Sequence, residues 1–253
     1  MRWALAALGL CAACTGAVTV PAQEDGAVVH PVAIHGRVLD LESCPSPAGC
    51  VPVAGVTVAL AADRGVVAAP TGREGAFLLE GVPPDSRQLL VVGPPAGAVG
   101  AYVPTLNANP VGVAKSDVFG VELYVLSGAD ADLLGAMARE STRDFRVTGG
   151  YLGEVIERTD VVTAVAGAHV ELLPAQFPMR YVNVIPRFAP GEPALQPEAA
   201  GLTSAFGLFA VATLDAAAEV AILVTADGLA FDLITVPMAP GEVAFGLHPG
   251  VRP

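Results

Sequence analysis

The sequence predicts an all-β protein made of two tandem β-sandwiches that are joined by a short helix. The 22 prolines and 28 glycines divide the chain into short β-rich runs, which is typical of sandwiches rather than helical bundles. Three motifs also occur twice in the same order, which indicates two copies of one β unit. The motifs are Ile-His-Gly-Arg-Val at 34–38, Val-Ala-Gly-Val-Thr-Val-Ala-Leu at 53–60 and Thr-Gly-Arg-Glu-Gly-Ala-Phe-Leu-Leu at 71–79, with counterparts at 151–155, 165–172 and 203–211.

The N-terminus is typical of an export signal. A single positive charge precedes a short apolar run and two alanines, and Cys14 follows directly. This segment resembles a bacterial lipobox, in which the last cysteine becomes the first residue of the mature protein and carries lipid, although Cys11 stands where leucine is usual. We therefore expect a lipoprotein signal peptide at 1–13 and a tether at 14–31, and an extracytoplasmic protein anchored in the outer membrane. An ordinary leader cut after Ala22, which would make the protein periplasmic or secreted, is the alternative.

The first sandwich is expected at 32–126. Its apolar and polar residues alternate at 56–58 and at 75–79, as in half-buried strands. Cys44 and Cys50 bracket a loop rich in proline and glycine, and in an exported protein such a pair is expected to form a disulfide. A metal site would need two further soft ligands nearby, and the sequence has none there.

Residues 127–146 are expected to form a helical connector. Asp130 and Asp132 would lie in its first turn, where a carboxylate interacts favourably with the helix dipole. The second sandwich follows at 147–253. It carries an insertion at 174–199 that the first unit lacks, and loops of this length inside a compact β domain are often functional.

Two motifs of the first unit resemble those of the carboxypeptidase regulatory-like domain. They are Pro-Val-Ala-Gly-Val-x-Val-x-Leu at 52–60 and Thr-x-x-x-Gly-x-Phe-x-Leu-x-x-Val-Pro at 71–83, after an initial Gly-x-Val. The second unit has alanine at 164 in place of the first proline and lacks the final Val-Pro, but it keeps the remainder. The resemblance implies a seven-stranded sandwich like that of transthyretin (prealbumin). In that family the domain is mostly an accessory module for folding, spacing or adhesion, and function does not follow from the fold.

Short segments at 36–40 and 167–171 also resemble intradiol ring-cleaving dioxygenases. That resemblance implies an iron held by two tyrosines and two histidines, with the histidines close together in the sequence. The four histidines of this chain are far apart, so a metal-dependent enzyme of this type is the least favoured alternative. The sequence predicts no enzyme, no catalytic residue, no metal site and no cofactor. The histidines are His30, His35, His169 and His248.

The formal net charge of −12 and the single lysine argue against a polyanionic partner, so nucleic-acid binding is excluded. Carbohydrate binding is an alternative function, because sugar rings stack on exposed aromatic side chains. Tyr102 and Tyr181 lie in segments that are expected to be irregular, and they are the candidates for such stacking. Tyr181 and Phe188, both within the insertion, are the candidates for a protein-binding surface.

These observations together predict an exported, lipid-anchored, non-enzymatic envelope or surface protein that acts as a spacer, scaffold or protein-binding module. The expected partner is another envelope protein or a glycan. Contact with the membrane is expected only through the lipidated Cys14.

Overall fold

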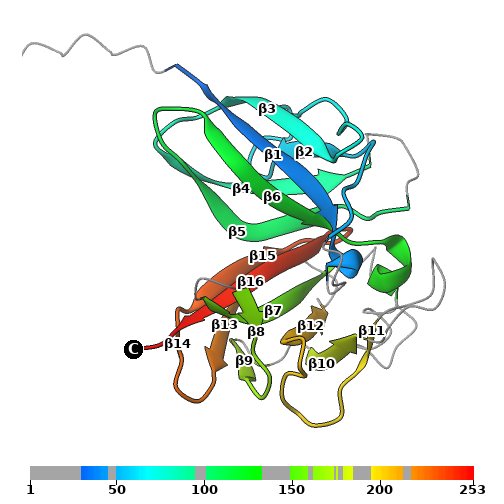
Figure 1. Cartoon of the computed structure of the whole chain (residues 1–253), viewed down its shortest axis with the longest axis vertical. Helices are drawn as coiled ribbons and strands as arrows, with labels where there is room; N and C mark the ends of the chain where they lie inside the picture. The colour runs from blue at the N-terminus through cyan, green and yellow to red at the C-terminus, as the bar shows by residue number, and fades with distance from the viewer. Residues whose placement is uncertain are drawn as a thin grey trace, which may run out of the picture.

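The computed structural model describes residues 30–44, 50–94, 101–132, 149–158, 162–173, 175, 179–184, 195–212 and 218–253. This part of the chain is nearly all β, and its strands are arranged in two sandwiches, one in the upper and one in the lower half of Figure 1. The predicted all-β fold of two tandem sandwiches is confirmed.

The first sandwich consists of two three-stranded layers. In one layer β1 pairs with β3 in antiparallel and with β6 in parallel orientation, and in the other β4 pairs with β2 and β5. Apolar side chains from both layers meet in a first core that includes Ile34, Val58, Leu79, Leu90 and Leu123. The elements are β1 (Val32–Asp40), the 3-10 turn η1 (Leu41–Ser43), β2 (Thr57–Leu60), β3 (Ala76–Val82), β4 (Ser86–Gly93), β5 (Thr105–Val113) and β6 (Val118–Val125).

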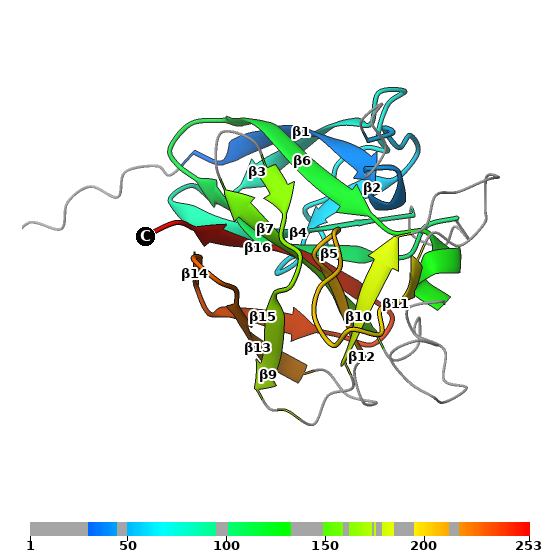
Figure 2. The ribbon, with the colours of Figure 1, turned by 60° about the horizontal axis from the view of Figure 1, so that its bottom comes forward.

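The second sandwich repeats this arrangement. Strand β7 pairs with β12 and β16 as β1 pairs with β3 and β6, and β13 pairs with β9 and β15 as β4 pairs with β2 and β5. Figure 2 shows β9, β13 and β15 as a separate layer beneath β7 and β16. The strands are β7 (Gly150–Arg158), β8 (Val162–Ala164), β9 (His169–Leu173), β10 (Met179–Val184), β11 (Leu195–Pro197), β12 (Leu208–Ala212), β13 (Ala218–Thr225), β14 (Ala230–Phe231), β15 (Ile234–Met238) and β16 (Val243–Val251).

The seventh strand that the transthyretin resemblance implies is unequal in the two copies. In the second sandwich it is β8, which pairs with β7. In the first sandwich it is reduced to one isolated bridge between Leu39 and Pro52. Two backbone hydrogen bonds flank this bridge, from Asp40 N–H to the Val51 carbonyl and from Val53 N–H to the Val38 carbonyl.

The repeat extends to individual hydrogen bonds. The hydroxyl of buried Thr71 accepts from the N–H of Val56 and donates to the carbonyl of Val53. In the second copy the Thr203 hydroxyl accepts from Ala168 N–H and donates to the Val165 carbonyl. Each threonine thus satisfies two backbone groups at the start of a strand, which a valine of the same shape cannot do.

A glycine opposite a phenylalanine also occurs in both copies. Gly36 lies opposite Phe77, and Gly153 lies opposite Phe209. A Cβ atom at either glycine would overlap the ring of its partner. The missing side chain therefore makes room for a large aromatic ring in each core, and this explains why the Gly-x-Val and Gly-x-Phe motifs occur together.

The two sandwiches share one sheet. Strand β16 pairs with β7 on one side and with β5 of the first sandwich on the other, in parallel orientation at both edges. The resulting sheet has the strand order β11-β10-β12-β7-β16-β5-β4-β2. Backbone hydrogen bonds thus cross from one copy to the other, which goes beyond the side-chain contact expected of two separate domains.

Side chains reinforce this junction. Asn109 on β5 bonds both backbone groups of Leu247 on β16, donating to the carbonyl at 2.9 Å and accepting from the N–H at 2.6 Å. Val91, Leu106 and Ala108, from β4 and β5, turn away from the first core and pack into the second. A third apolar cluster, here called the junction core, consists of Val103, Leu126, Ala131, Leu152, Val182, Leu208, Ala210, Val243 and Phe245.

A short helix begins after β6, as expected. Residues 128–132 are helical, and the remainder of the predicted connector lies outside the described residues. Ser127 caps this helix, because its hydroxyl accepts from the N–H of Asp130 at 3.2 Å. Among the helices in the described part of the chain, none has the length and apolar character needed to cross a membrane.

Candidate functional site

The candidate site is the outer face of the sheet β3-β1-β6 in the first sandwich. The equivalent face in the second sandwich, on β12-β7-β16, is buried in the junction core. On the second sandwich, Leu152 lies opposite Ala210, and both belong to the junction core. By the same register, His35 lies opposite Leu78 on the first sandwich. Leu78 is 44% exposed, so the face that is an internal interface in one copy is open in the other.

A pair of aromatic rings, one half-buried and one exposed, stands on this open face. The rings of His35 and Phe119 are stacked, with centroids 4.4 Å apart and planes inclined by 22°. The Phe119 side chain is 69% exposed, the highest value among the large hydrophobic side chains of the described residues. Leu78, His35 and Phe119 come from three neighbouring strands, so two exposed apolar side chains flank a half-buried imidazole on this face.

A β-bulge sets the position of Phe119. Ile34 pairs with Val118 and Gly36 with Val121, so His35 alone faces two residues of β6, Phe119 and Gly120. Gly120 has a φ of 74°, which a residue with a side chain rarely adopts. Bulges redirect side chains, and this one turns Phe119 onto the imidazole of His35.

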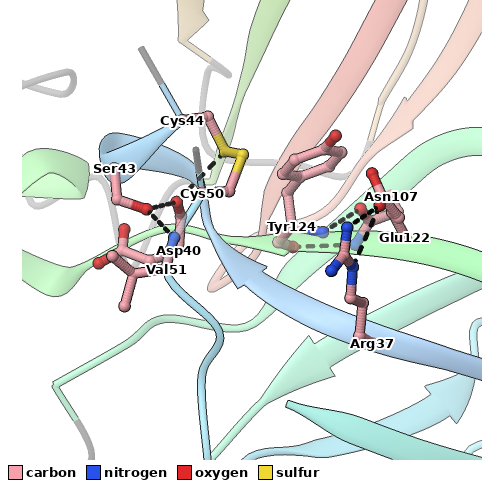
Figure 3. The surroundings of a disulfide bond; sticks show 9 residues. All are labelled: Arg37, Asp40, Ser43, Cys44, Cys50, Val51, Asn107, Glu122 and Tyr124. Carbon is pink, nitrogen blue, oxygen red and sulfur yellow. Dashed lines mark hydrogen bonds and ion pairs between the residues drawn. A yellow bond between two sulfur atoms is a disulfide. The ribbon is translucent and has the colours of Figure 1, made fainter. Parts of the chain in front are cut away.

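An ion pair lies beside the aromatic pair. Arg37 on β1 reaches Glu122 on β6, as Figure 3 shows, and its Nε donates to Oε1 of Glu122 at 3.1 Å while Nη2 donates to the same oxygen. The hydrogen bond to Glu122 and its negative charge raise the pKa of Arg37 above its ordinary value. The guanidinium therefore stays charged, and the second carboxylate oxygen of Glu122 takes no part in either bond.

A shallow hollow separates the aromatic pair from the ion pair. Its volume is about 420 Å³, and it is open to solvent. Gly120 lines it and has nothing within 4 Å of the place where a Cβ would stand, so the backbone is accessible at this residue. The lining residues are His35, Gly36, Arg37, Gly120, Val121 and Glu122.

The tyrosines that the sequence singled out do not lie on this face. Tyr181 is only 7% exposed, and its hydroxyl oxygen accepts a hydrogen bond from Val170 N–H at 2.9 Å. The expectation of an exposed Tyr181 is therefore wrong: β10 joins the sheet beside β12 and turns this ring into the second core. Tyr102 is half-buried against the first core, and burial together with Asp40 raises its pKa. Phe188 and Cys14 lie outside the described residues.

The predicted disulfide between Cys44 and Cys50 is confirmed. It closes the loop that follows β1 and η1 (Figure 3). Ser43 supports the same loop, because its hydroxyl donates to the Asp40 carbonyl at 2.7 Å and accepts from Val51 N–H at 2.6 Å. These contacts hold the segment between β1 and the bridge at Pro52, far along β1 from the aromatic pair.

Two buried ionisable side chains distinguish the second sandwich from the first. Tyr151 and His248 occupy the core positions that Ile34 and Leu123 hold in the first copy, and the Tyr151 hydroxyl lies 2.7 Å from His248 Nε2. Burial lowers the pKa of His248 to about 4, so the imidazole is neutral at pH 7. Its Nδ1 has no hydrogen-bond partner among the described residues.

Glu154 is a further ionisable side chain of the second sandwich. It occupies the position of Arg37 in the repeat, where the junction largely buries it, and burial raises its pKa to about 7. No group of three or more His, Cys, Asp or Glu side chains that could hold a metal ion occurs in the described ranges. His248 is enclosed in the second core, and Glu154 lies half-buried at the junction.

The sequence reasoning did not assign a binding role to Arg37, Glu122 or Phe119, and among these Phe119 had a signal in the sequence. The signal available was Gly120, since a glycine inside a strand pattern often marks a bulge. Alternation of apolar and polar residues predicts which face of the sheet each side chain of β6 points to. That prediction fails for Phe119, because the bulge changes the direction of its side chain.

No protein-family model matches the chain, and no curated protein sequence matches it. Three solved structures align with most of its length. The first is GBS52, the minor pilin of Streptococcus agalactiae, with 12% identity over 88% of this chain and 96% of that chain and a TM-score of 0.30. The second is the Bacillus anthracis TIE protein, with 10% identity over 87% of this chain and 34% of that chain and a TM-score of 0.27. The third is the shaft pilin SpaA of Lactobacillus rhamnosus GG, with 10% identity over 88% of this chain and 98% of that chain and a TM-score of 0.24. These TM-scores are below the level at which two chains share a fold, so no property of those proteins is transferred to this one.

Proposed function

We propose that the chain is an exported, lipid-anchored, non-enzymatic module of the cell envelope that holds one binding face in a fixed orientation. The observation that carries this proposal is the sheet shared through β16 and β5. Two sandwiches on a flexible linker would reorient independently, whereas backbone pairing and the junction core hold them as one body. A rigid body of this kind suits a spacer or scaffold.

The extracytoplasmic part of the proposal rests on two features. Cys14 ends the leader in a lipobox-like context, and the disulfide between Cys44 and Cys50 is of the kind that persists in oxidising compartments. The proposed organisation is a signal peptide at 1–13, a tether at 14–31, and carboxypeptidase regulatory-like sandwiches at 32–126 and 147–253 around a connector at 127–146. Residues 174–199 are an insertion in the second sandwich. The location proposed for this lipid-anchored protein is the outer membrane.

Anchoring is tested by fractionation of cells that produce the full chain. Cys14→Ser should move the mature protein from the membrane fraction to the soluble extracytoplasmic fraction, whereas the matched variant Cys11→Ser should stay with the membrane. Release of the wild-type protein together with both variants would contradict lipid anchoring. It would indicate the leader cut after Ala22 instead.

Rigidity is tested by distances between spin labels. Labels on Glu80→Cys and Thr235→Cys report on β3 and β15, one strand in each sandwich, and both positions are exposed. The distance distribution should be as narrow as that of the control pair Glu80→Cys and Arg87→Cys, which lies within the first sandwich. A broad distribution for the first pair alone would overturn the proposal of a rigid spacer.

A further inference from the structure

The two copies of the repeat differ most at the outer face of their first sheet. Strand β16 follows β7 without interruption from Val243 to Gly250, but its counterpart β6 is interrupted by the bulge at Phe119 and Gly120. The bulge is therefore not required by the fold, since the second copy forms the same sheet without it. It produces the stacked pair and the hollow beside it, which are features of the first copy alone.

We propose that this hollow binds a neutral saccharide, with the ring of the sugar against His35 and its hydroxyl groups on Arg37 and Glu122. The inference rests on the proposed function and names the ligand class of its binding face. The chemistry needed is an apolar platform for the C–H face of a sugar and charged groups for its hydroxyls, because sugars present both kinds of surface.

The aromatic platform is held in place before a ligand arrives. His35 lines the hollow and Phe119 does not, so the phenyl ring supports the imidazole from outside the hollow. A ring already stacked on one side loses little rotational freedom when a sugar covers it, and this reduces the entropic cost of binding.

The polar groups are held in the same way. Arg37 and Glu122 fix each other by two hydrogen bonds that share Oε1, which leaves Oε2 of Glu122 outside this pair. An acceptor and a donor set side by side match the adjacent hydroxyls of a sugar ring. Gly120 has open space where a side chain would stand, and this lets a ligand approach the main chain closely at that residue.

Charge decides between neutral and acidic saccharides. The two charges of the ion pair cancel, and the whole chain carries a formal net charge of −12. An acidic polysaccharide would therefore be repelled over most of the surface and gain little at the hollow. A neutral saccharide avoids this repulsion and still receives hydrogen bonds from charged groups.

The test uses the purified mature protein and titration calorimetry with four neutral probes: cellotetraose, maltotetraose, mannotetraose and chitotetraose. At least one should bind with a measurable heat, and an acidic probe, tetragalacturonate, should not. Arg37→Ala and Phe119→Ala should each weaken binding by about tenfold or more. Leu233→Ala, an exposed apolar change on the second sandwich, should leave binding unchanged.

Circular dichroism should show the same folded spectrum for all variants, because the changed side chains are exposed. Absence of binding to all four neutral probes would overturn the inference, as would binding that Arg37→Ala and Phe119→Ala leave intact. Association of two copies that Phe119→Ala abolishes would assign the face to self-assembly and would equally overturn it. The fractionation and spin-label results do not depend on a saccharide, so this inference and the proposed function fail separately.

Discussion

Replacement of His248 by leucine should remove much of the acid sensitivity of the second sandwich. His248 is 1% exposed and packs against Tyr151 and Phe209. A buried imidazole resists protonation, because the charged form would lose its hydration without gaining a partner charge. The unfolded chain has no such restriction. Below the ordinary pKa of histidine the unfolded state therefore takes up a proton that the folded state does not.

The magnitude follows from the two pKa values. The folded value is lowered from 6.5 to about 4, so the contribution of neutral His248 to stability is complete above pH 6.5 and is lost as the pH falls towards 4. The difference corresponds to about 3 kcal/mol of unfolding free energy. Leucine is the residue at the equivalent position of the first core, Leu123, so the second core is expected to accommodate it.

The assay is urea unfolding followed by far-UV circular dichroism at pH 7.5 and pH 4. The wild-type protein should lose about 3 kcal/mol more than His248→Leu between these two conditions. Comparison of the two losses cancels the titration of all other groups. His248→Leu leaves the Tyr151 hydroxyl without its partner and should lower stability at both pH values, so Tyr151→Phe is the matched background. Equal losses for the wild-type protein and the variant would refute the reasoning.

Three further predictions concern other parts of the molecule. Because the pKa of Glu154 is raised to about 7, its carboxylate lowers the stability of the protein as the pH rises from about 4.5 to about 7. Glu154→Gln should therefore raise the free energy of unfolding by roughly 2–3 kcal/mol at pH 8 and have little effect at pH 4. Urea unfolding at the two pH values measures this difference. Gly207→Ala should lower the melting temperature far more than Gly228→Ala. Both glycines have a positive φ, but only at Gly207 would a Cβ overlap a carbonyl oxygen of β7. Similar losses for the two variants would contradict this. Reduction of the disulfide between Cys44 and Cys50 should cost about 2 kcal/mol, the value for a loop this short, and an unchanged urea midpoint would show that the loop is held by other contacts.

The sequence was sufficient for the architecture where its signals are local. The recurrence of Gly-x-Val, Ala-Gly and Gly-x-Phe motifs reflects Gly36 and Gly153 making room for Phe77 and Phe209, and these contacts occur in both copies. The paired cysteines are six positions apart, so their bond could be expected from spacing alone.

The junction could not be predicted in this way. Asn109 and Leu247 are 138 positions apart, and no short motif marks strands that pair over such a distance. A weaker signal existed in the runs at 89–92 and 243–245, which are apolar without alternation. Such runs are typical of strands buried on both faces, and β4 and β16 are buried in this way.

Tyr181 illustrates a different reason for error. The insertion was rich in proline, which favours an irregular loop, but β10 within it gains a partner in β12 and a place for its ring in the second core. Tertiary packing overrode local propensity at this residue. The hydroxyl oxygen accepts a hydrogen bond from the backbone of β9, which is compatible with burial of this polar atom.

The parallel pairing of β16 with β5 also determines when the molecule is completed during synthesis and translocation. A chain that emerges N-terminus first can finish the first sandwich at β6, which ends at Val125. Strand β5 gains its neighbour β16 only when the chain from Val243 onward has followed. Until then an open strand edge is exposed to other chains. That edge is short, because β16 uses only Thr105 to Asn107, and Pro110 interrupts the ladder soon afterwards. The C-terminal strand therefore acts as the last closing element for both sandwiches, and a chain truncated before Val243 would leave each of them with an unpaired inner edge.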